Sequence, residues 1–204
     1  MALDTYSDLS SAITDWLNDA NLSTKVDTFI RLAEARFNRV VRHPDMESFT
    51  TLSLTAETAS LPAGAVGIKI MWIDGSPDNQ LVPMSLSDLK MLYGGRSGTP
   101  QAYAIAGGNI YFGPVSSSDT VQVIYYTGIP NLNGTTNTTN WLLTSHPDIY
   151  LFACLVMAEA RGWNDERLPL LKSALDEALA ELSAAGQKKR YGGAPLQARS
   201  AVVA

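Results

Sequence analysis

The sequence predicts an α+β protein, mainly helical, in which a helical bundle built from both ends of the chain carries an inserted β-rich subdomain. Apolar residues recur at helical spacing near each end and alternate at strand spacing in the middle. The chain has 204 residues, 46% of them apolar, which is enough for an ordinary domain core. The expected parts are a helical bundle of residues 1–45 and 141–186, a β-rich part of residues 46–140, and an extended C-terminal arm of residues 187–204.

Two helices are expected before residue 45. The first begins after Thr5, a favourable N-cap, and ends within residues 18–21. The second begins at Ser23 or Thr24 and ends at His43, because Pro44 disfavours helical geometry in the residue before it. Its polar surface is either solvated or in contact with a neighbouring subunit, and it carries Glu34 with four arginines, Arg31, Arg36, Arg39 and Arg42.

The middle of the chain has the two-residue period of strands. Gly107 and Gly108 suit a turn between two of them, because glycine tolerates positive φ. A short strand near residues 80–84 could pair with the preceding one as a hairpin, and residues 87–92 suit a short helix. Residues 131–140, rich in Asn, Thr and Gly, are expected to be a loop that is mobile until something holds it. The main strands are expected at residues 49–55, 66–73, 101–106, 109–112 and 121–127.

Two helices are expected after this loop. Ser145 caps the first, and Gly162 breaks it. The second begins at Asn164 or Asp165 and ends at Gly186, in the usual C-terminal role of glycine. The segment beyond Gly186 is either a disordered tail or an arm that orders on a partner.

Charge is unevenly distributed along the chain. Residues 187–204 contain four basic and no acidic side chains, so residues 1–186 hold 11 basic and 20 acidic ones and carry −9, against −5 for the whole chain. Phosphate contacts need a basic surface, so this acidic body argues against gripping DNA. Charged residues make up 17% of the chain, below the usual ~25%, as in a subunit that buries surface against partners.

Little in the sequence points to catalysis. Cys154 lies in an apolar run and is expected to be a plain core residue, and with only two histidines, His43 and His146, neither a metal site nor a cofactor is expected. A glycosidase needs only two carboxylates. Glu159 and either Asp165 or Glu166, which lie near one helix junction, could supply them. A glycosidase is therefore an alternative function, although acids at helix starts are usually explained by the helix dipole.

Several stretches resemble the head-to-tail adaptor proteins of phages, also called tail accessory or head-completion proteins of short-tailed phages. They are residues 4–9 with Trp16-Leu17, residues 29–39, Leu61-Pro62, residues 98–105, residues 125–130, residues 140–151, and residues 165–168 with the leucine helix that comes after them. The match covers roughly residues 4 to 185, and its specificity comes from the order of these pieces.

The resemblance implies a structural virion protein and no enzyme. The alternative is a virion-associated peptidoglycan hydrolase that uses a carboxylate pair such as Glu159 and Asp165. It implies a ring, usually of twelve copies, assembled in the host cytoplasm and docked under the portal at the head-tail junction. The ring would extend the DNA channel, through which the genome passes without specific binding, and would seat the tail proteins. Neither a signal peptide nor membrane contact is expected.

The resemblance also gives the C-terminal arm a role, because this segment typically reaches back to the portal. A third possibility, a nucleic-acid-binding factor, would instead use the basic cluster Lys188, Lys189 and Arg190 for salt-dependent DNA binding. The expected portal-binding residues are Gln187, Lys188, Lys189, Arg190, Tyr191, Gly192, Gly193, Pro195 and Arg199.

Overall fold

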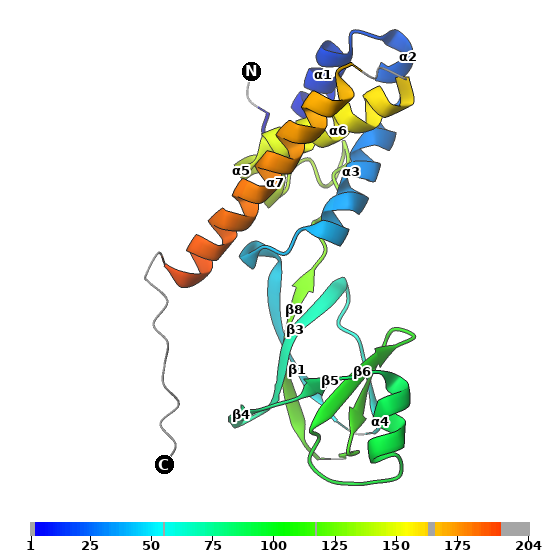
Figure 1. The fold of residues 1–204 in the computed structure, drawn as a ribbon, viewed down its shortest axis with the longest axis vertical. Helices are drawn as coiled ribbons and strands as arrows, with labels where there is room; N and C mark the ends of the chain where they lie inside the picture. Colours follow the sequence, from blue (N-terminus) through cyan, green and yellow to red (C-terminus); the bar gives the residue numbers. More distant parts are fainter. Residues whose placement is uncertain (1–2, 55, 117, 163–165, 193–204) are drawn as a thin grey trace. The chain divides into compact units, whose positions relative to one another are not determined.

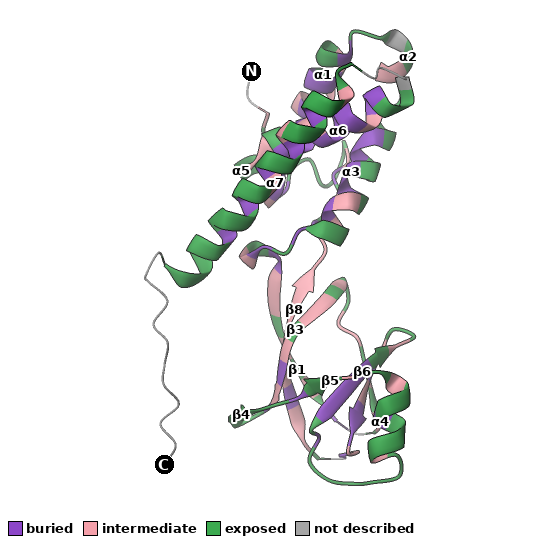
Figure 2. Cartoon of the chain, viewed as in Figure 1, coloured by how far each residue is buried: buried purple, intermediate pink, exposed green. Residues whose placement is uncertain are grey.

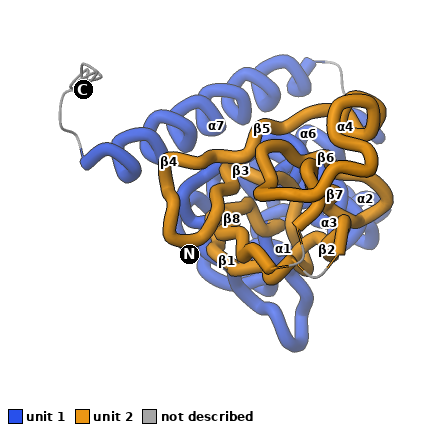
Figure 3. The backbone as a smooth tube through the Cα atoms, turned by 90° about the horizontal axis from the view of Figure 1, so that it is seen from below, with its two compact units in different colours: residues 1–45, 129–204 blue, residues 46–128 orange. Residues whose placement is uncertain are grey.

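The computed structural model describes residues 3–54, 56–116, 118–162 and 166–192, and the chain divides into two compact units (Figures 1 and 3). Unit 1 contains residues 1–45 and 129–204, and unit 2 contains residues 46–128. The described residues hold more helix than strand, which confirms the predicted α+β class.

Unit 1 is helical. Helix α6 contacts α1, α3, α5 and α7, and it is buried along most of its length (Figure 2). Cys154 lies fully buried in it as a free thiol, which confirms the predicted core position. The helices described in this unit are α1 (Tyr6–Leu17), α2 (Ala20–Ser23), α3 (Val26–Val40), α5 (Trp141–Ser145), α6 (Pro147–Gly162) and α7 (Leu168–Tyr191).

The N-terminal helices begin and end where side chains satisfy their backbone groups. Thr5 and Asp8 form a capping box at the start of α1. The single helix predicted from Ser23 or Thr24 to His43 is wrong at both ends. Asp19 accepts hydrogen bonds from the amides of Asn21 and Leu22 and so starts the short helix α2, after which α3 begins. At the other end the backbone becomes extended at Val41, and both Val41 and His43 turn into the core.

Helix α7 is longer than predicted. It does not end at Gly186 but continues to Tyr191, and Gly192, with φ of +60°, provides the left-handed cap. Gly186 is buried, and a Cβ there would lie 2.7 Å from Cδ2 of His43. This glycine is therefore explained by close packing rather than by helix termination.

The connection between unit 2 and α6 is also more ordered than predicted. Asn140 caps α5, a short helix that precedes the one expected at Ser145. In the loop before it, the side chain of Asn133 accepts hydrogen bonds from the amides of Thr135, Thr136 and Asn137. The loop is held by the chain's own side chains and needs no partner for that purpose.

The described residues of unit 2 form two four-stranded sheets and one helix. One sheet has the order β1-β8-β3-β4 and the other β2-β7-β6-β5, and all neighbours are antiparallel except β5 and β6. The elements are β1 (Glu47–Ser53), β2 (Thr58–Ser60), β3 (Ala65–Ile73), β4 (Ser76–Gln80), β5 (Val82–Pro83), α4 (Leu86–Tyr93), β6 (Ala102–Ala106), β7 (Asn109–Gly113) and β8 (Thr120–Thr127), preceded by a 3₁₀ turn at Pro44–Met46.

Both sheets of unit 2 contribute to one apolar core. Met71 and Val123 from the first sheet meet Ile110 and Phe112 from the second. The predicted strands near residues 49–55, 66–73, 101–106, 109–112 and 121–127 are confirmed, with shifted ends.

The predicted hairpin with residues 80–84 is correct only in part: Gln80 pairs with Trp72, and the amide of Leu81 donates to the carbonyl of Met71. The turn at Gly75, with φ of +76°, pairs Ile73 with Ser76 and makes β4 the partner of β3. Residues 82–83 instead join the second sheet, where Val82 pairs with Ala102.

Candidate partner-binding surface at the end of helix α7

The basic cluster of the sequence lies in the last turns of α7. Residues 187–191, expected as part of an extended arm, are helical, so that part of the prediction is wrong. Lys188, Lys189 and Arg190 are exposed there, and positive charge is favourable near the C-terminal end of a helix. Three of the expected portal-binding residues, Gly193, Pro195 and Arg199, lie outside the described residues.

This end of α7 is anchored to the segment that comes after α3. Lys189 forms an ion pair with Asp45, and the ring of His43 stacks on Trp141 with centroids 5.1 Å apart. Nδ1 of His43 lies 3.3 Å from the amide nitrogen of Asp45 and 3.4 Å from its Oδ2. Gly186 allows α7 to approach this buried ring closely.

Burial keeps this imidazole neutral. Desolvation lowers the pKa of His43, and the positive charges of Lys189 and Arg190 and the neighbouring His146 lower it further. Asp45 acts in the opposite direction and raises the pKa. Because desolvation is the largest of these effects, His43 is a packing residue at neutral pH rather than a charged contact.

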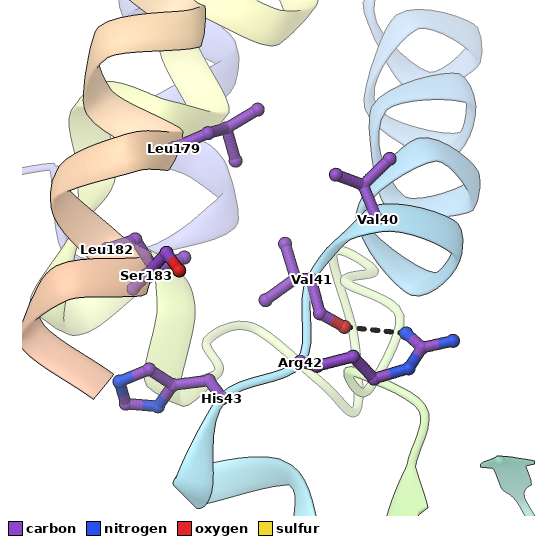
Figure 4. A pocket seen from close by; sticks show the side chains of 7 residues that line it. All are labelled: Val40, Val41, Arg42, His43, Leu179, Leu182 and Ser183. Atoms are coloured by element: carbon purple, nitrogen blue, oxygen red, sulfur yellow. Dashed lines mark hydrogen bonds between the residues drawn. The ribbon is translucent and has the colours of Figure 1, made fainter. Parts of the chain in front are cut away.

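A small cavity adjoins the anchor, between α7 and the end of α3 (Figure 4). It measures about 250 Å³, and its apolar walls are Val40, Val41, Leu179 and Leu182. Ser183, Arg42 and His43 complete the lining. These groups can accommodate an apolar side chain, and among the described residues no hydrogen bond joins the Ser183 hydroxyl to His43, as an activated nucleophile would need.

The four arginines expected at a subunit interface have different surroundings. Arg36 binds Asp176 of α7 at 3.3 Å. Arg42 donates from Nη1 to the carbonyl oxygens of Asn38 (3.0 Å) and Val41 (2.6 Å). Arg31 lies near the carboxylate of Glu34, whose pKa it lowers, and Arg39 is exposed.

Glu34 does not lie on the solvated face where the sequence placed it. Its residue exposure is only 2%, and Oε1 accepts hydrogen bonds from the amide of Leu132 (2.6 Å) and the hydroxyl of Tyr150 (3.4 Å). Oε2 is buried without a hydrogen-bond partner among the described residues. Desolvation therefore raises the pKa of Glu34, although both hydrogen bonds and Arg31 act to lower it.

Spacing could have revealed this position, because Glu34 comes after Val26 and Ile30 at intervals of four on the apolar stripe of α3.

The carboxylates considered for hydrolysis do not form a described pair. Glu159 is buried and bound to Arg167, with 3.0 Å between Oε1 and Nη1. Asp165 lies outside the described residues, and Glu166 is exposed. Among the residues that the structure describes, no three His, Cys, Asp or Glu side chains gather where they could hold a metal ion.

The sequence model of the SU10 adaptor protein family matches residues 4–199. The chain belongs to the SU10 adaptor protein family. The adaptor is thus a structural phage protein, which confirms the resemblance to phage adaptors and implies contacts with other head and tail proteins. No curated protein matches it. None of the adaptor's described helices is long and apolar enough to cross a membrane.

Proposed function

We propose that the adaptor forms a ring, of twelve copies as the resemblance implies, that docks under the portal at the head-tail junction. The ring extends the DNA channel and provides the attachment site for the tail. The observation that carries this proposal is the match to an adaptor family over residues 4–199.

The portal-facing element is the end of α7 with the segment beyond it. Lys188, Lys189 and Arg190 project from the last turns of a helix whose inner side is fixed by Gly186 and the Lys189–Asp45 ion pair. A fixed helix end presents its charges with little loss of conformational freedom on binding, which favours affinity. The complementary surface on the portal is acidic.

The charge of the body suits a DNA channel. Residues 1–186 carry a net −9, so the ring offers few cations to hold phosphates. Like charge between the wall and the genome allows DNA to slide through without being retained. Which residues line the channel depends on the geometry of the ring. We place the arginines of α3 at the contacts between subunits and not in the channel.

Native mass spectrometry of the adaptor, alone and mixed with the portal ring of the same phage, tests the proposal. The expected result is a ring of adaptor copies bound to the portal. An adaptor that does not bind the portal would overturn the proposal.

The double variant Lys188→Glu, Arg190→Glu should weaken portal binding at least tenfold, since like-charge juxtaposition is costly at an interface. Lys172→Glu, an exposed change near the other end of α7, is the matched control and should leave binding unchanged.

A further inference from the structure

We infer that two different faces of unit 1 meet between neighbouring copies of the adaptor. One, the α1 cavity, is an apolar cavity beside α1, and the other, the Leu32 face, is the exposed face of α3 that carries Leu32 and Arg39. This inference rests on the proposed function, because it presupposes that copies of the adaptor assemble. It adds which two surfaces make the contact.

The α1 cavity is apolar with one acidic residue in its lining. It measures about 340 Å³ and is lined by Leu3, Ala12, Asp15, Trp16 and Leu151. Trp16 is 48% exposed there, although tryptophan is usually well buried. Asp15 is exposed, without a hydrogen bond or ion pair to any described residue, and α1 contains no basic side chain that could neutralise it.

The Leu32 face has the complementary properties. Leu32 is also 48% exposed, on the side of α3 opposite its buried stripe. Arg39 lies two helical turns further along the same face, about 10 Å away at 1.5 Å per residue. It is exposed and makes no ion pair within the described part of the chain, whereas Arg36 between them is bound to Asp176.

The two surfaces point in different directions. Helix α3 packs its buried stripe on α6, so the Leu32 face is directed away from α6. The α1 cavity includes Leu151, a residue of α6 itself. A copy therefore does not close its own cavity with its own Leu32 face.

The pairing between copies is supported by shape and charge together. An exposed leucine of one copy can enter the apolar cavity of the next, while Arg39 approaches the unpartnered Asp15. Exposed apolar groups rimmed by charge mark protein interfaces, and a central apolar anchor supplies most of the binding energy. Because the two faces differ, the contact is heterologous and can repeat from copy to copy until a ring closes.

Charge reversal tests the pairing under the conditions in which the wild type assembles, with or without the portal. Asp15→Arg alone and Arg39→Asp alone should each raise the concentration needed for half-assembly at least tenfold. An equal mixture of the two variants should recover assembly, because each contact then joins an acid to a base. Leu32→Ser should weaken assembly as well, whereas Leu170→Ser, which changes a 74% exposed leucine of α7, should not.

The outcomes separate the pairing from the proposed function. Assembly that is unchanged by either reversal, or a mixture that does not recover it, overturns the pairing of these faces even when the portal is bound. Self-assembly that responds to the reversals without any portal binding supports the pairing and overturns the proposed function. Far-UV circular dichroism of each variant confirms that the helices are retained, so a loss of assembly is not a loss of folding.

Discussion

The two units of the adaptor satisfy buried polar groups in different ways. Four of the buried polar residues described, Glu34, His43, Asn140 and Glu159, lie in unit 1, where each meets a loop or a segment outside the helices. Unit 2 has only Ser116 among its described buried polar residues. The hydroxyl oxygen of Ser116 accepts hydrogen bonds from the amides of Ser118 and Asp119, and backbone pairing also holds this loop, as where the amide of Leu54 donates to the carbonyl of Asp119.

The difference arises from the backbone groups that each element leaves free. A helix consumes its backbone donors and acceptors internally, so a loop laid across its side can be satisfied only by side chains. Strands pair laterally, so a sheet can continue into its loops with backbone groups alone. A helical unit that holds a long loop therefore needs buried polar side chains, and it must accept their desolvation.

The loop at residues 129–140 shows this arrangement in detail. Asn38 of α3 accepts a hydrogen bond from the amide of Ile129 (2.7 Å), and Glu34 accepts one from the amide of Leu132. Asn140 donates to the carbonyl of Pro130 (2.8 Å) and to the hydroxyl of Tyr150 (2.7 Å). The first and last parts of the loop are thus fixed on α3 and α6.

The largest effect is expected from an apolar truncation in unit 2. Phe112→Ala should lower the free energy of unfolding of that unit by about 3–5 kcal/mol, because it leaves a cavity in the shared core of the two sheets. Hydrogen exchange should show faster exchange in β6 and β7 and unchanged protection in α6. An equal loss of protection in α6 would show that the core of unit 1 depends on that of unit 2, contrary to this prediction.

The next effect is expected from the polar network of unit 1. Glu34→Ala should cost about 2–3 kcal/mol, because the amide of Leu132 is left buried without an acceptor. Urea unfolding measures the loss, and exchange of the Leu132 amide locates it. Glu34→Gln keeps an acceptor oxygen and is the matched control. A Glu34→Ala variant as stable as the Glu34→Gln variant would show that burial, not the hydrogen bond, holds the loop.

Much of the fold could be predicted from local patterns. Alternation predicts the strands of unit 2, with Val121 and Val123 buried as expected, and the Thr5 cap predicts the start of α1. Some errors came from local caps that were missed, such as Asp19 at the start of α2, and others came from tertiary contacts. Gly186 has the usual sequence context of a helix end, but its role is set by the ring of His43, which is 143 residues away in the chain.

The candidate surfaces were harder to predict than the fold. The basic end of α7 is visible in the sequence, but its anchoring by Asp45 is not, because no local pattern links residues so distant. Glu34 was treated as a surface acid because charged residues are rarely buried. The α1 cavity depends on Leu3, Leu151 and Trp16 meeting in space, which a single sequence does not show.

A smaller effect, and one specific to unit 1, is expected from pH. The pKa of Glu34 is raised in the folded protein, so the folded state holds a proton above pH 4.5 that the unfolded state has lost. The stability of the wild type relative to Glu34→Gln should therefore fall as pH rises from 4.5 through the folded-state pKa. Tyr150 and Cys154, which face Glu34, have raised pKa values and stay neutral throughout this range.

Urea unfolding of both proteins at about pH 4.5 and about pH 8 measures this change, which should be smaller than the loss caused by Glu34→Ala. If the stability of the wild type relative to Glu34→Gln rose with pH instead, the fold would stabilise the carboxylate form of Glu34, and the prediction would be wrong.

The smallest effect is expected from the ion pair at the end of α7. Lys189→Ala should change the free energy of unfolding by no more than about 0.5 kcal/mol, because the Lys189 side chain is more than half exposed and the pair is screened by solvent. Gly186→Ala removes no charge but forces a Cβ against the His43 ring, which is itself stacked on Trp141, so it should cost more, about 1–3 kcal/mol. Thermal unfolding of the two variants gives the order. If Lys189→Ala lowered the unfolding temperature more than Gly186→Ala, the ion pair rather than the packing on His43 would anchor α7. That result would contradict the view that buried side chains hold the segments outside the helices in unit 1.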